Sequence, residues 1–439
     1  MQLPEAFVIR TKDLLGDDWT AFEQALNEES PVSIRLNPQK TSKELLSETA
    51  TLPLSESISW TTMGFYLSSR PKFTLDPLFH AGCYYVQEPS SMILEHFVRN
   101  YFPQPAKVLD LCAAPGGKST HLSALLSNES LLVANEVIRS RASVLVENLT
   151  KWGNPNTLVT CNEPAEIGKS LPEFFDVIVA DLPCSGEGMF RKDPAAVAEW
   201  SVNNVRLCAE RQRRIIADVL PSLKPEGILI YSTCTYNREE NEENIEWICR
   251  EFAAELLEEP RRMMPHQIRG EGFFIAAIKK QVQGERFKVK GEGLKVKGEG
   301  LKVKEFLPFT FYPLPFTYIL DNVRWIAVPE IHYPDYLQIK SKLRILSAGV
   351  ALGEMKGKDY VPAHGLAMSN ALSETAFPRW EVDRETALSY LRKEAMQNVP
   401  PENSKGYLLI TYKRQPLGFV KNIGTRANNL YPQAWRIRL

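Results

Sequence analysis

The sequence has few cysteines and histidines, and neither residue type occurs in a pattern typical of a disulfide framework or a metal site. The seven cysteines are an odd number, and no two of them form a C-x-x-C pair. The six histidines are scattered along the 439 residues. A disulfide framework and a zinc ribbon are therefore excluded, no metal is expected, and a reducing cytoplasm is the expected compartment.

Long hydrophobic runs are also missing. The most apolar late stretch, Leu307–Leu320, is shorter than a membrane span and contains three prolines. The first ten residues, MQLPEAFVIR, contain no basic segment followed by an apolar one, so no signal peptide is expected. The sequence therefore predicts no membrane partner.

The composition is that of an ordinary globular protein, with 44% hydrophobic and 24% charged residues. A chain of this length is expected to fold as two to four domains. The formal net charge is −1, but from Glu402 onward seven basic residues face one acidic residue. A basic tail on a neutral body allows a nucleic-acid partner, which the total charge alone would disfavour.

A short repeat divides the chain. Residues Lys288–Lys304 read KVKGEGLKVKGEGLKVK, which is too short and too poor in bulky side chains for a repeat fold and is typical of a linker. The sequence thus predicts a small N-terminal subdomain (1–74), a main domain (75–281), a repetitive linker (282–304) and a C-terminal region (305–439).

The main domain alternates apolar strands with helices, which predicts a doubly wound α/β sheet covered on both faces. Long helical patterns follow the strands, notably over Val205–Leu223 and Glu239–Glu255. The N-terminal 70 residues show one helical stretch and one strand-like segment, Ser33–Lys40. The predicted buried strands of the main domain are Ala106–Leu111, Leu131–Glu136, Thr157–Cys161, Phe175–Asp181, Gly227–Thr233 and Phe273–Ile278.

Ligands of such sheets bind at the carboxyl ends of the strands, where this chain has several polar residues. The loop Asp110–Lys118 (DLCAAPGGK) joins the first strand to a helix, and its glycines allow close approach of a ligand. Glu136 ends the second strand, where an acid can accept both ribose hydroxyls of a nucleoside. Glu163, just past the third strand, is a candidate acceptor for an adenine amino group.

Two cysteines follow the next strands. Asp181 and Cys184 lie after the fourth strand, and Cys234 after the fifth. A thiolate is a strong nucleophile, and a carboxylate beside it can hold or move a proton. Thiolate addition to carbon 6 of cytosine would activate carbon 5 toward the methyl group of S-adenosylmethionine, so these residue types fit an RNA cytosine-5 methyltransferase.

At these residues the sequence resembles the RNA cytosine-5 methyltransferases of the NOP/Sun type, and most of all the bacterial ribosomal-RNA branch (RsmF-type). The resemblance runs through Gly82–Ser91, Asp110–Lys118, Asp181–Pro194, Tyr231–Glu243 and Gly418–Arg438, and it spans nearly the whole chain outside the repeat. The paired motifs P-C-S-G and S-T-C-T, in this order, are highly specific.

The resemblance implies a role for each candidate residue. Cys234 corresponds to the nucleophile, Cys184 to the cysteine that assists product release, and Asp181 to a residue near the methyl-transfer centre that also borders the cofactor. Glu136 would bind the ribose, and Glu163 stands where this branch usually has Asp. The implied S-adenosylmethionine loop consists of Cys112, Ala113, Ala114, Pro115, Gly116, Gly117 and Lys118.

The C-terminal region is implied to contain an RNA-binding module of the pseudouridine-synthase-and-archaeosine-transglycosylase (PUA) type. Its own residues agree, because basic side chains that can follow phosphates alternate with aromatic side chains. Most of the aromatic residues are expected to pack a small β core, with the basic residues outside. The basic residues are Lys413, Arg414, Lys421, Arg426, Arg436 and Arg438, and the aromatic ones Tyr407, Tyr412, Phe419, Tyr431 and Trp435.

Other functions stay open at this point. A catalytically silent RNA-binding or ribosome-assembly factor would need neither Cys184 nor Cys234, and a thiol redox protein would more typically use a C-x-x-C turn. Ribosomal RNA, or a small ribosomal subunit, is the favoured substrate, with transfer RNA as the alternative. A monomer in the cytoplasm is expected.

Overall fold

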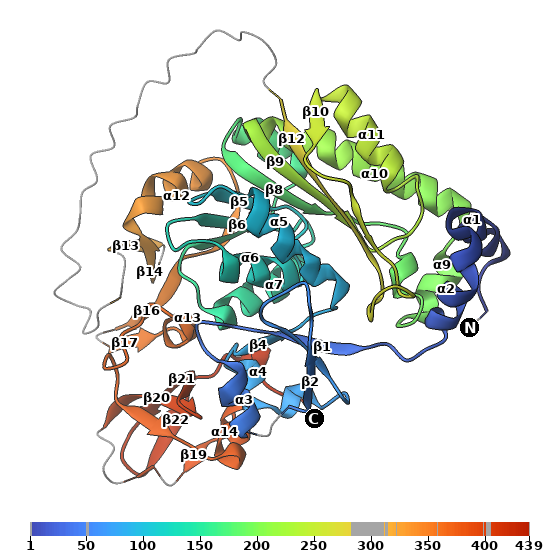
Figure 1. The fold of residues 1–439 in the computed structure, drawn as a ribbon. Coiled ribbons are helices and arrows are strands. Elements are labelled where there is room, and N and C mark those ends of the chain that lie inside the picture. Colours follow the sequence, from blue (N-terminus) through green and yellow to red (C-terminus); the bar gives the residue numbers. More distant parts are fainter. Residues whose placement is uncertain are drawn as a thin grey trace, which may run out of the picture.

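The computed structural model of the chain describes residues 2–49, 52–281, 311, 315–321, 323–357, 359–397, 399–400 and 405–438 (Figure 1). The predicted repetitive linker, residues 282–304, lies outside the described residues. Within the described ranges, no helix is long and apolar enough to cross a membrane.

A nine-stranded sheet forms the centre of the molecule, in the order β10-β12-β9-β8-β5-β6-β7-β15 with β11 paired to β12. The five strands from β9 to β7 are parallel, as predicted, and all but a few of their residues are buried. The strands are β5 (Lys107–Asp110), β6 (Leu131–Asn135), β7 (Thr157–Thr160), β8 (Phe175–Asp181), β9 (Leu223–Thr233), β10 (Ala254–Leu256), β11 (Arg261–Met263), β12 (Phe273–Lys280) and β15 (Ile345–Ala348).

Helices cover both faces of this sheet, because residues of each strand point alternately to opposite faces (Figure 1). Val108 packs with α5 and α6 on one face, and Leu109 packs with α8, α10 and α11 on the other. The helices of the main domain are α5 (Leu94–Tyr101), α6 (Gly117–Leu125), α7 (Arg139–Trp152), α8 (Pro164–Ser170), α9 (Pro194–Glu199), α10 (Val202–Val219) and α11 (Glu242–Glu251).

Two predictions about this sheet were wrong in detail. The strands outside the parallel core, including β12, are antiparallel to their neighbours. The helix predicted over Glu239–Glu255 covers only Glu242–Glu251. Ala253 takes a positive φ of 47°, so the chain reverses there and continues into β10, which pairs with β12. The helical periodicity of the sequence does not show this reversal.

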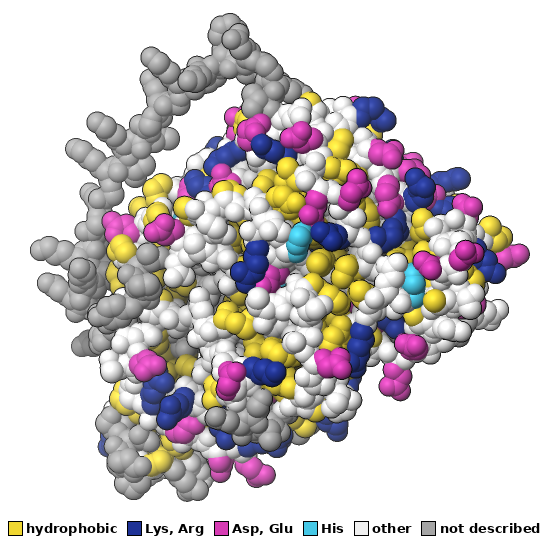
Figure 2. Space-filling model, viewed as in Figure 1, with side chains coloured by type: hydrophobic (Ala, Val, Ile, Leu, Met, Phe, Trp, Pro, Cys, Tyr) yellow, Lys and Arg dark blue, Asp and Glu magenta, His cyan; other side chains and the backbone are white. Residues whose placement is uncertain are grey.

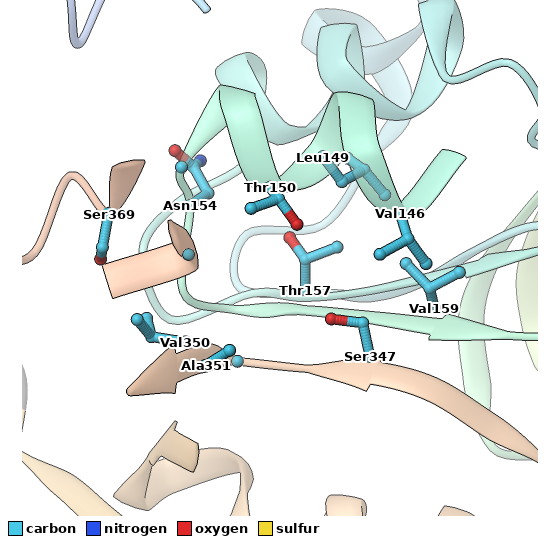
Figure 3. A pocket seen from close by; sticks show the side chains of 13 residues that line it. Val146, Leu149, Thr150, Asn154, Thr157, Val159, Ser347, Val350, Ala351 and Ser369 are labelled. Carbon is cyan, nitrogen blue, oxygen red and sulfur yellow. The ribbon is translucent and has the colours of Figure 1, made fainter. Parts of the chain in front are cut away.

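The segment after the linker completes the central sheet. Strand β15 pairs with β7, and α12 (Tyr333–Lys340) buries Tyr336 and Ile339 on the face that also holds α8 and α10. Figure 3 shows the resulting contact, where side chains of α7 and β7 lie opposite those of the returning segment around a small cavity of about 40 Å³. The pairing therefore crosses the predicted boundary at residue 304.

The described part of the N-terminal region holds four helices and a four-stranded sheet rather than one helical stretch and one strand. Its helices bury Phe7 and Phe22 against Trp200 and Tyr236 of the main domain. Its sheet, in the order β2-β3-β1-β4, extends past residue 74 because β4 completes it. The elements are α1 (Glu5–Leu15), α2 (Trp19–Leu26), β1 (Val32–Leu36), α3 (Lys43–Thr49), β2 (Leu54–Ser57), β3 (Gly64–Leu67), α4 (Pro77–His80) and β4 (Tyr84–Val86).

The C-terminal region forms two further small sheets, β13-β14-β16-β17 and β18-β20-β21-β22-β19. The second packs against the N-terminal sheet in one hydrophobic cluster that includes Ile34 and Tyr390. The elements are β13 (Phe316–Asp321), β14 (Arg324–Pro329), β16 (Val350–Lys356), β17 (Asp359–Pro362), α13 (His364–Met368), β18 (Arg379–Glu381), α14 (Arg384–Leu391), β19 (Met396–Gln397), β20 (Gly406–Tyr412), β21 (Gln415–Asn422) and β22 (Arg426–Asn429).

The aromatic and basic residues of the C-terminal module separate as predicted. Tyr412, Phe419 and Tyr431 are buried, whereas Lys413 and Arg426 are exposed. On the face shown in Figure 2, lysine and arginine side chains are mixed with acidic ones over the main domain. This mixture agrees with the formal net charge of −1.

Candidate active site

The loop between β5 and α6 forms one wall of the site at the carboxyl edge of the sheet. Gly116 caps α6 with a φ of 116°, a left-handed conformation that favours glycine. A Cβ added to Gly117 would lie 3.4 Å from Cε1 of Tyr85 on β4, so this face of the loop is tightly shaped. The free N–H groups at the start of α6 suit an anionic group of a ligand.

Two buried carboxylates lie near this loop with one oxygen each unsatisfied. Asp110 Oδ2 accepts a hydrogen bond from Ser119 Oγ at 2.6 Å, and Glu136 Oε1 accepts one from the Ile138 amide at 3.0 Å. Within the described residues, Asp110 Oδ1 and Glu136 Oε2 accept no hydrogen bond, although Glu136 Oε2 forms an ion pair with Arg141 Nη1 at 3.4 Å. Burial raises the pKa of Asp110 to about 7. Unsatisfied buried oxygens are costly, so these atoms fit the hydroxyl or ammonium groups of a ligand.

Glu163 lies in a different environment from Glu136. It is exposed at the N-terminus of α8, where it forms a capping box with Glu166. Its local role is therefore to cap the helix. A contact from its carboxylate to an adenine ring stays a proposal.

Lys118, Asp181 and Ser232 form a connected polar group at the ends of β8 and β9. Lys118 Nζ donates to Asp181 Oδ2 at 2.7 Å, and Ser232 Oγ donates to Asp181 Oδ1 at 2.9 Å. Burial opposes the charge on Lys118, but the Asp181 carboxylate more than offsets this, and the pKa of Lys118 is raised. The Asp181 side chain keeps an exposed fraction of 31%, so it remains accessible.

The two predicted cysteines lie in direct contact. Cys184 Sγ and Cys234 Sγ are 3.3 Å apart, although 50 residues separate them in the sequence. Adjacent parallel strands β8 and β9 bring them together, since the pairing of Asp181 with Ser232 aligns the two strand ends. The hydrogen bond to Cys234 and burial raise the pKa of Cys184 well above its ordinary value.

A cavity of about 410 Å³ opens over these groups. It brings Cys234 together with Asp181 and Lys118 and with the loop from Cys112 to Pro115. Glu136, Glu163 and Cys184 are not among the residues that line it. The remaining lining residues are Tyr85, Val86, Gln87, Glu88, Ser91, Gly117, Gly188, Met189, Lys192, Glu271, Gly272 and Phe273.

Three known families match successive parts of the chain. Residues 102–279 match the family described as 16S rRNA methyltransferase RsmB/F. Residues 3–89 match the N-terminal domain of 16S rRNA methyltransferase RsmF, and residues 377–437 match the methyltransferase RsmF PUA domain.

Relatives agree over almost the whole chain. Ribosomal RNA small subunit methyltransferase F of Cronobacter sakazakii is 31% identical over 466 residues, covering 98% of this chain and 96% of the relative. The chain belongs to the RsmF family of ribosomal RNA methyltransferases. The protein of the same name from Pectobacterium atrosepticum is 35% identical over 306 residues, which cover 63% of each chain.

Solved structures support the same fold. A methyltransferase homologue from Pyrococcus horikoshii is similar with a TM-score of 0.55 and 30% identity, over 63% of this chain and 95% of that one. The structure of NSun6 from the same organism gives a TM-score of 0.56 at 22% identity, which shows the fold alone. Membership in the RsmF family confirms the predicted Rossmann-like methyltransferase sheet, the C-terminal PUA domain and the enzyme class.

Sequence reasoning missed two buried residues, Glu240 and Arg35, that support this RsmF site without lining its cavity. Glu240 is fully buried and accepts hydrogen bonds from the Ser185 amide at 3.0 Å and from Gln212 Nε2 at 2.8 Å. Arg35, also fully buried, donates to Gln87 and Thr120. Glu240 lies in the acidic run NREENEE, which resembles an exposed helix start, so no sequence signal marks it as buried.

Among the residues that the structure describes, no group of three His, Cys, Asp or Glu side chains is placed to hold a metal ion.

Proposed function

We propose that this protein methylates carbon 5 of a cytosine in small-subunit ribosomal RNA, with S-adenosylmethionine as the methyl donor. The observation that carries the proposal is the contact of two thiols, Cys184 and Cys234, at 3.3 Å beside Asp181. RNA binding alone requires none of these three side chains at one strand edge. A thiol next to a hydrogen-bonded carboxylate suits covalent catalysis on a pyrimidine ring.

The residues around the loop fit S-adenosylmethionine. Glu136 Oε2, which is ion-paired with Arg141 but accepts no hydrogen bond, suits a ribose hydroxyl, and the unpartnered oxygen of Asp110 suits the ammonium group of the methionine part. The loop Cys112–Lys118 would enclose the cofactor, with Gly116 and Gly117 permitting close approach. When bound, S-adenosylmethionine supplies an electrophilic methyl group.

Cys234 is the proposed nucleophile because it lines the cavity with Lys118 and Asp181. Its sulfur would add to carbon 6 of a cytosine flipped into the cavity, which makes carbon 5 nucleophilic. Asp181, fixed by Lys118 and Ser232, would accept a hydrogen bond from the cytosine amino group or share a proton with N3.

Cys184 is proposed to act after methyl transfer. It touches the Cys234 sulfur but does not line the cavity, so it can reach the ring only once the ring is bonded to Cys234. Cys184 would first lose its own proton to solvent. Its thiolate would then take the carbon 5 proton, and the electron pair of the broken C–H bond would expel the Cys234 thiolate and release the methylated base. Glu163 is proposed to contact the adenine ring from the start of α8.

The substrate of the enzyme is proposed from the names of its relatives and from its N-terminal and PUA domains, both of which are proposed to bind RNA. Their printed names specify ribosomal RNA of the small subunit, so we infer this substrate rather than transfer RNA. The exposed basic residues of the PUA domain would contact phosphates. We further infer a monomer that acts in the cytoplasm.

The test is methyl transfer from radiolabelled S-adenosylmethionine to RNA from small ribosomal subunits, followed by digestion to nucleosides. We expect label only in 5-methylcytidine with the wild-type enzyme and none with Cys234→Ala. Label in another nucleoside, or full activity of Cys234→Ala, would refute the proposed chemistry. Binding of RNA with no transfer by the wild-type enzyme would favour a silent assembly factor.

A further inference from the structure

The charges around the two thiols are unequal. Lys118 lines the cavity with Cys234 and interacts with it electrostatically. Glu240 lies on the side of Cys184, because its carboxylate accepts the hydrogen bond of Ser185 N, the residue that follows Cys184. A cation therefore faces one sulfur and an anion faces the other.

We propose that Glu240 is a positioning residue that keeps the proton shared by the two thiols on Cys184, so that Cys234 is the thiolate. The inference rests on the proposed function, since it explains how two touching thiols take different roles in it. Glu240 does not line the cavity, and its carboxylate accepts no hydrogen bond from either cysteine sulfur.

The hydrogen bonds of Glu240 keep its charge in place without neutralising it. Oε2 accepts from Ser185 N at 3.0 Å and Gln212 Nε2 at 2.8 Å, and Oε1 accepts from Asn237 Nδ2 at 2.8 Å. All three donors are neutral N–H groups. Gln212 Nε2 also donates to Pro183 O at 3.0 Å, so Glu240 and Gln212 fix the residues on both sides of Cys184.

The other titratable groups around Glu240 come from several elements. Glu187, on the 3₁₀ turn Glu187–Met189, repels it, and Cys208 on α10 and Tyr231 on β9 are both affected by its charge. Burial raises the pKa of Glu240 to about 6, so the carboxylate is ionised at neutral pH. An ionised carboxylate near Cys184 favours the protonated form of that thiol.

The proton balance of this step is simple. The pair loses one of its two protons to solvent, and one proton remains for two sulfurs 3.3 Å apart. The proton lost is that of Cys234: its S–H bond breaks, the electron pair stays on the Cys234 sulfur, and the S–H bond of Cys184 is kept. The protonated Cys184 then donates a hydrogen bond to the Cys234 thiolate, which stabilises it.

The experiment measures the relative alkylation rates of the two thiols by iodoacetamide in the full-length enzyme, resolved by peptide mass spectrometry. We expect Glu240→Gln to lower the ratio of Cys234 to Cys184 alkylation by about fivefold at neutral pH, because the charge that favours protonated Cys184 is gone. Glu240→Asp keeps the charge and should restore a ratio within about twofold of wild type.

Glu187→Gln is the matched control. Glu187 is also buried and is bound by neutral donors, Trp200 Nε1, the Tyr236 amide and Asn237, but unlike Glu240 it accepts no hydrogen bond from Ser185, the residue next to Cys184. Its substitution should leave the ratio nearly unchanged. An unchanged ratio in folded Glu240→Gln, or an equal drop in Glu187→Gln, would overturn the inference.

A titration of the wild-type enzyme covers the case in which Glu240→Gln does not fold. Between about pH 7.5 and pH 5.5 Glu240 becomes protonated, and the ratio should fall as it does so. A constant ratio over this range contradicts the inference. Neither measurement uses RNA or cofactor, so the inference can fail while Cys234→Ala still abolishes methylation, and methylation by Cys234→Ala would refute the proposed function whatever the ratio.

Discussion

Two buried polar clusters lie beside the proposed catalytic cavity, one next to the start of α6 and one next to the thiols, and they differ in charge and in origin. The cofactor-end cluster is built around the Arg35 guanidinium and comprises Arg35, Gln87, Glu95, Thr120 and His121. The thiol-end cluster is built around carboxylates and comprises Ser185, Glu187, Gln212, Asn237 and Glu240.

The origin of each cluster follows from the fold. Arg35 lies on β1 of the N-terminal sheet, yet it donates to the Gly117 carbonyl and Thr120 in α6, more than 80 residues away. The thiol-end residues all come from the chain between β8 and α11. The N-terminal region therefore supports the proposed cofactor site and also packs against the PUA domain. The thiol site is supported instead by the loops after β8 and β9 and by α10.

The largest expected effect is that of Arg35→Ala at the cofactor end. The substitution removes hydrogen bonds to Gln87 and Thr120 and the contact of the guanidinium with the Trp152 ring, 4.7 Å from its centroid. We expect unfolding to become easier by about 3 kcal/mol and the KM for S-adenosylmethionine to rise. Denaturant titration and steady-state kinetics measure both.

Arg99→Ala is the control for Arg35→Ala. Arg99 pairs with Glu95 of the same cluster, but its side chain is 55% exposed, so its loss should cost less than about 1 kcal/mol. Equal effects of the two substitutions would show that Arg35 has no special role in holding α6.

Glu136→Ala is expected to have the next largest effect. Its buried Oε2 accepts no hydrogen bond within the described residues and can accept one from a ribose hydroxyl, so the KM for S-adenosylmethionine should rise more than kcat falls. The loss of charge-assisted hydrogen bonds should cost about 1.5–3 kcal/mol of binding free energy. Calorimetric titration that shows unchanged affinity would contradict the assignment.

Acid should affect the two clusters in opposite directions. Burial lowers the pKa of His121 to about 4. As the pH falls below about 6.5, the unfolded chain therefore binds a proton at His121 while the folded chain does not, and stability is lost. At about pH 5 this costs about 2 kcal/mol. Burial raises the pKa of Glu240 to about 6, so the folded state binds a proton first and gains stability as the pH falls through that value.

Hydrogen exchange at different pH values, corrected for intrinsic rates, distinguishes the two ends. Between about pH 7 and pH 5, we expect α6 of the wild type to lose protection relative to α6 of His121→Gln, because Asp110, which accepts a hydrogen bond from Ser119 of α6, takes up a proton in both proteins. The loop that carries Cys184 should keep or gain protection. The same loss of protection at both ends would show that the clusters are not separate.

The smallest expected effect is that of Glu163→Ala. Its exposed carboxylate caps α8, so its removal should cost about 0.5–1 kcal/mol of stability. The KM for S-adenosylmethionine should rise less than in Glu136→Ala, because an exposed acceptor competes with water. A rise larger than that of Glu136→Ala would make Glu163 the main cofactor contact.

The same contrast explains what the sequence could predict. The strands β5 to β9 and the residues at their ends follow from local pattern, so Cys184, Cys234 and Asp181 are placed correctly at one edge. The pairing of β15 with β7 and the contact of Arg35 with α6 join distant segments without a local pattern. The burial of Glu240 could not be predicted for a different reason. It depends on α10, whose Gln212 bonds to Glu240, whereas the acidic sequence of its loop is typical of an exposed segment.

The most direct test of the division of labour between the thiols is a denaturing gel of enzyme incubated with S-adenosylmethionine and small-subunit RNA. Cys184→Ala should accumulate a slowly migrating, ribonuclease-sensitive protein–RNA band, because Cys234 adds to the base but the methylated product is not released. Cys234→Ala and the double alanine variant should show no such band. A band in Cys234→Ala but not in Cys184→Ala would reverse the roles of the two cysteines, and full methylation by both single variants would refute thiol catalysis.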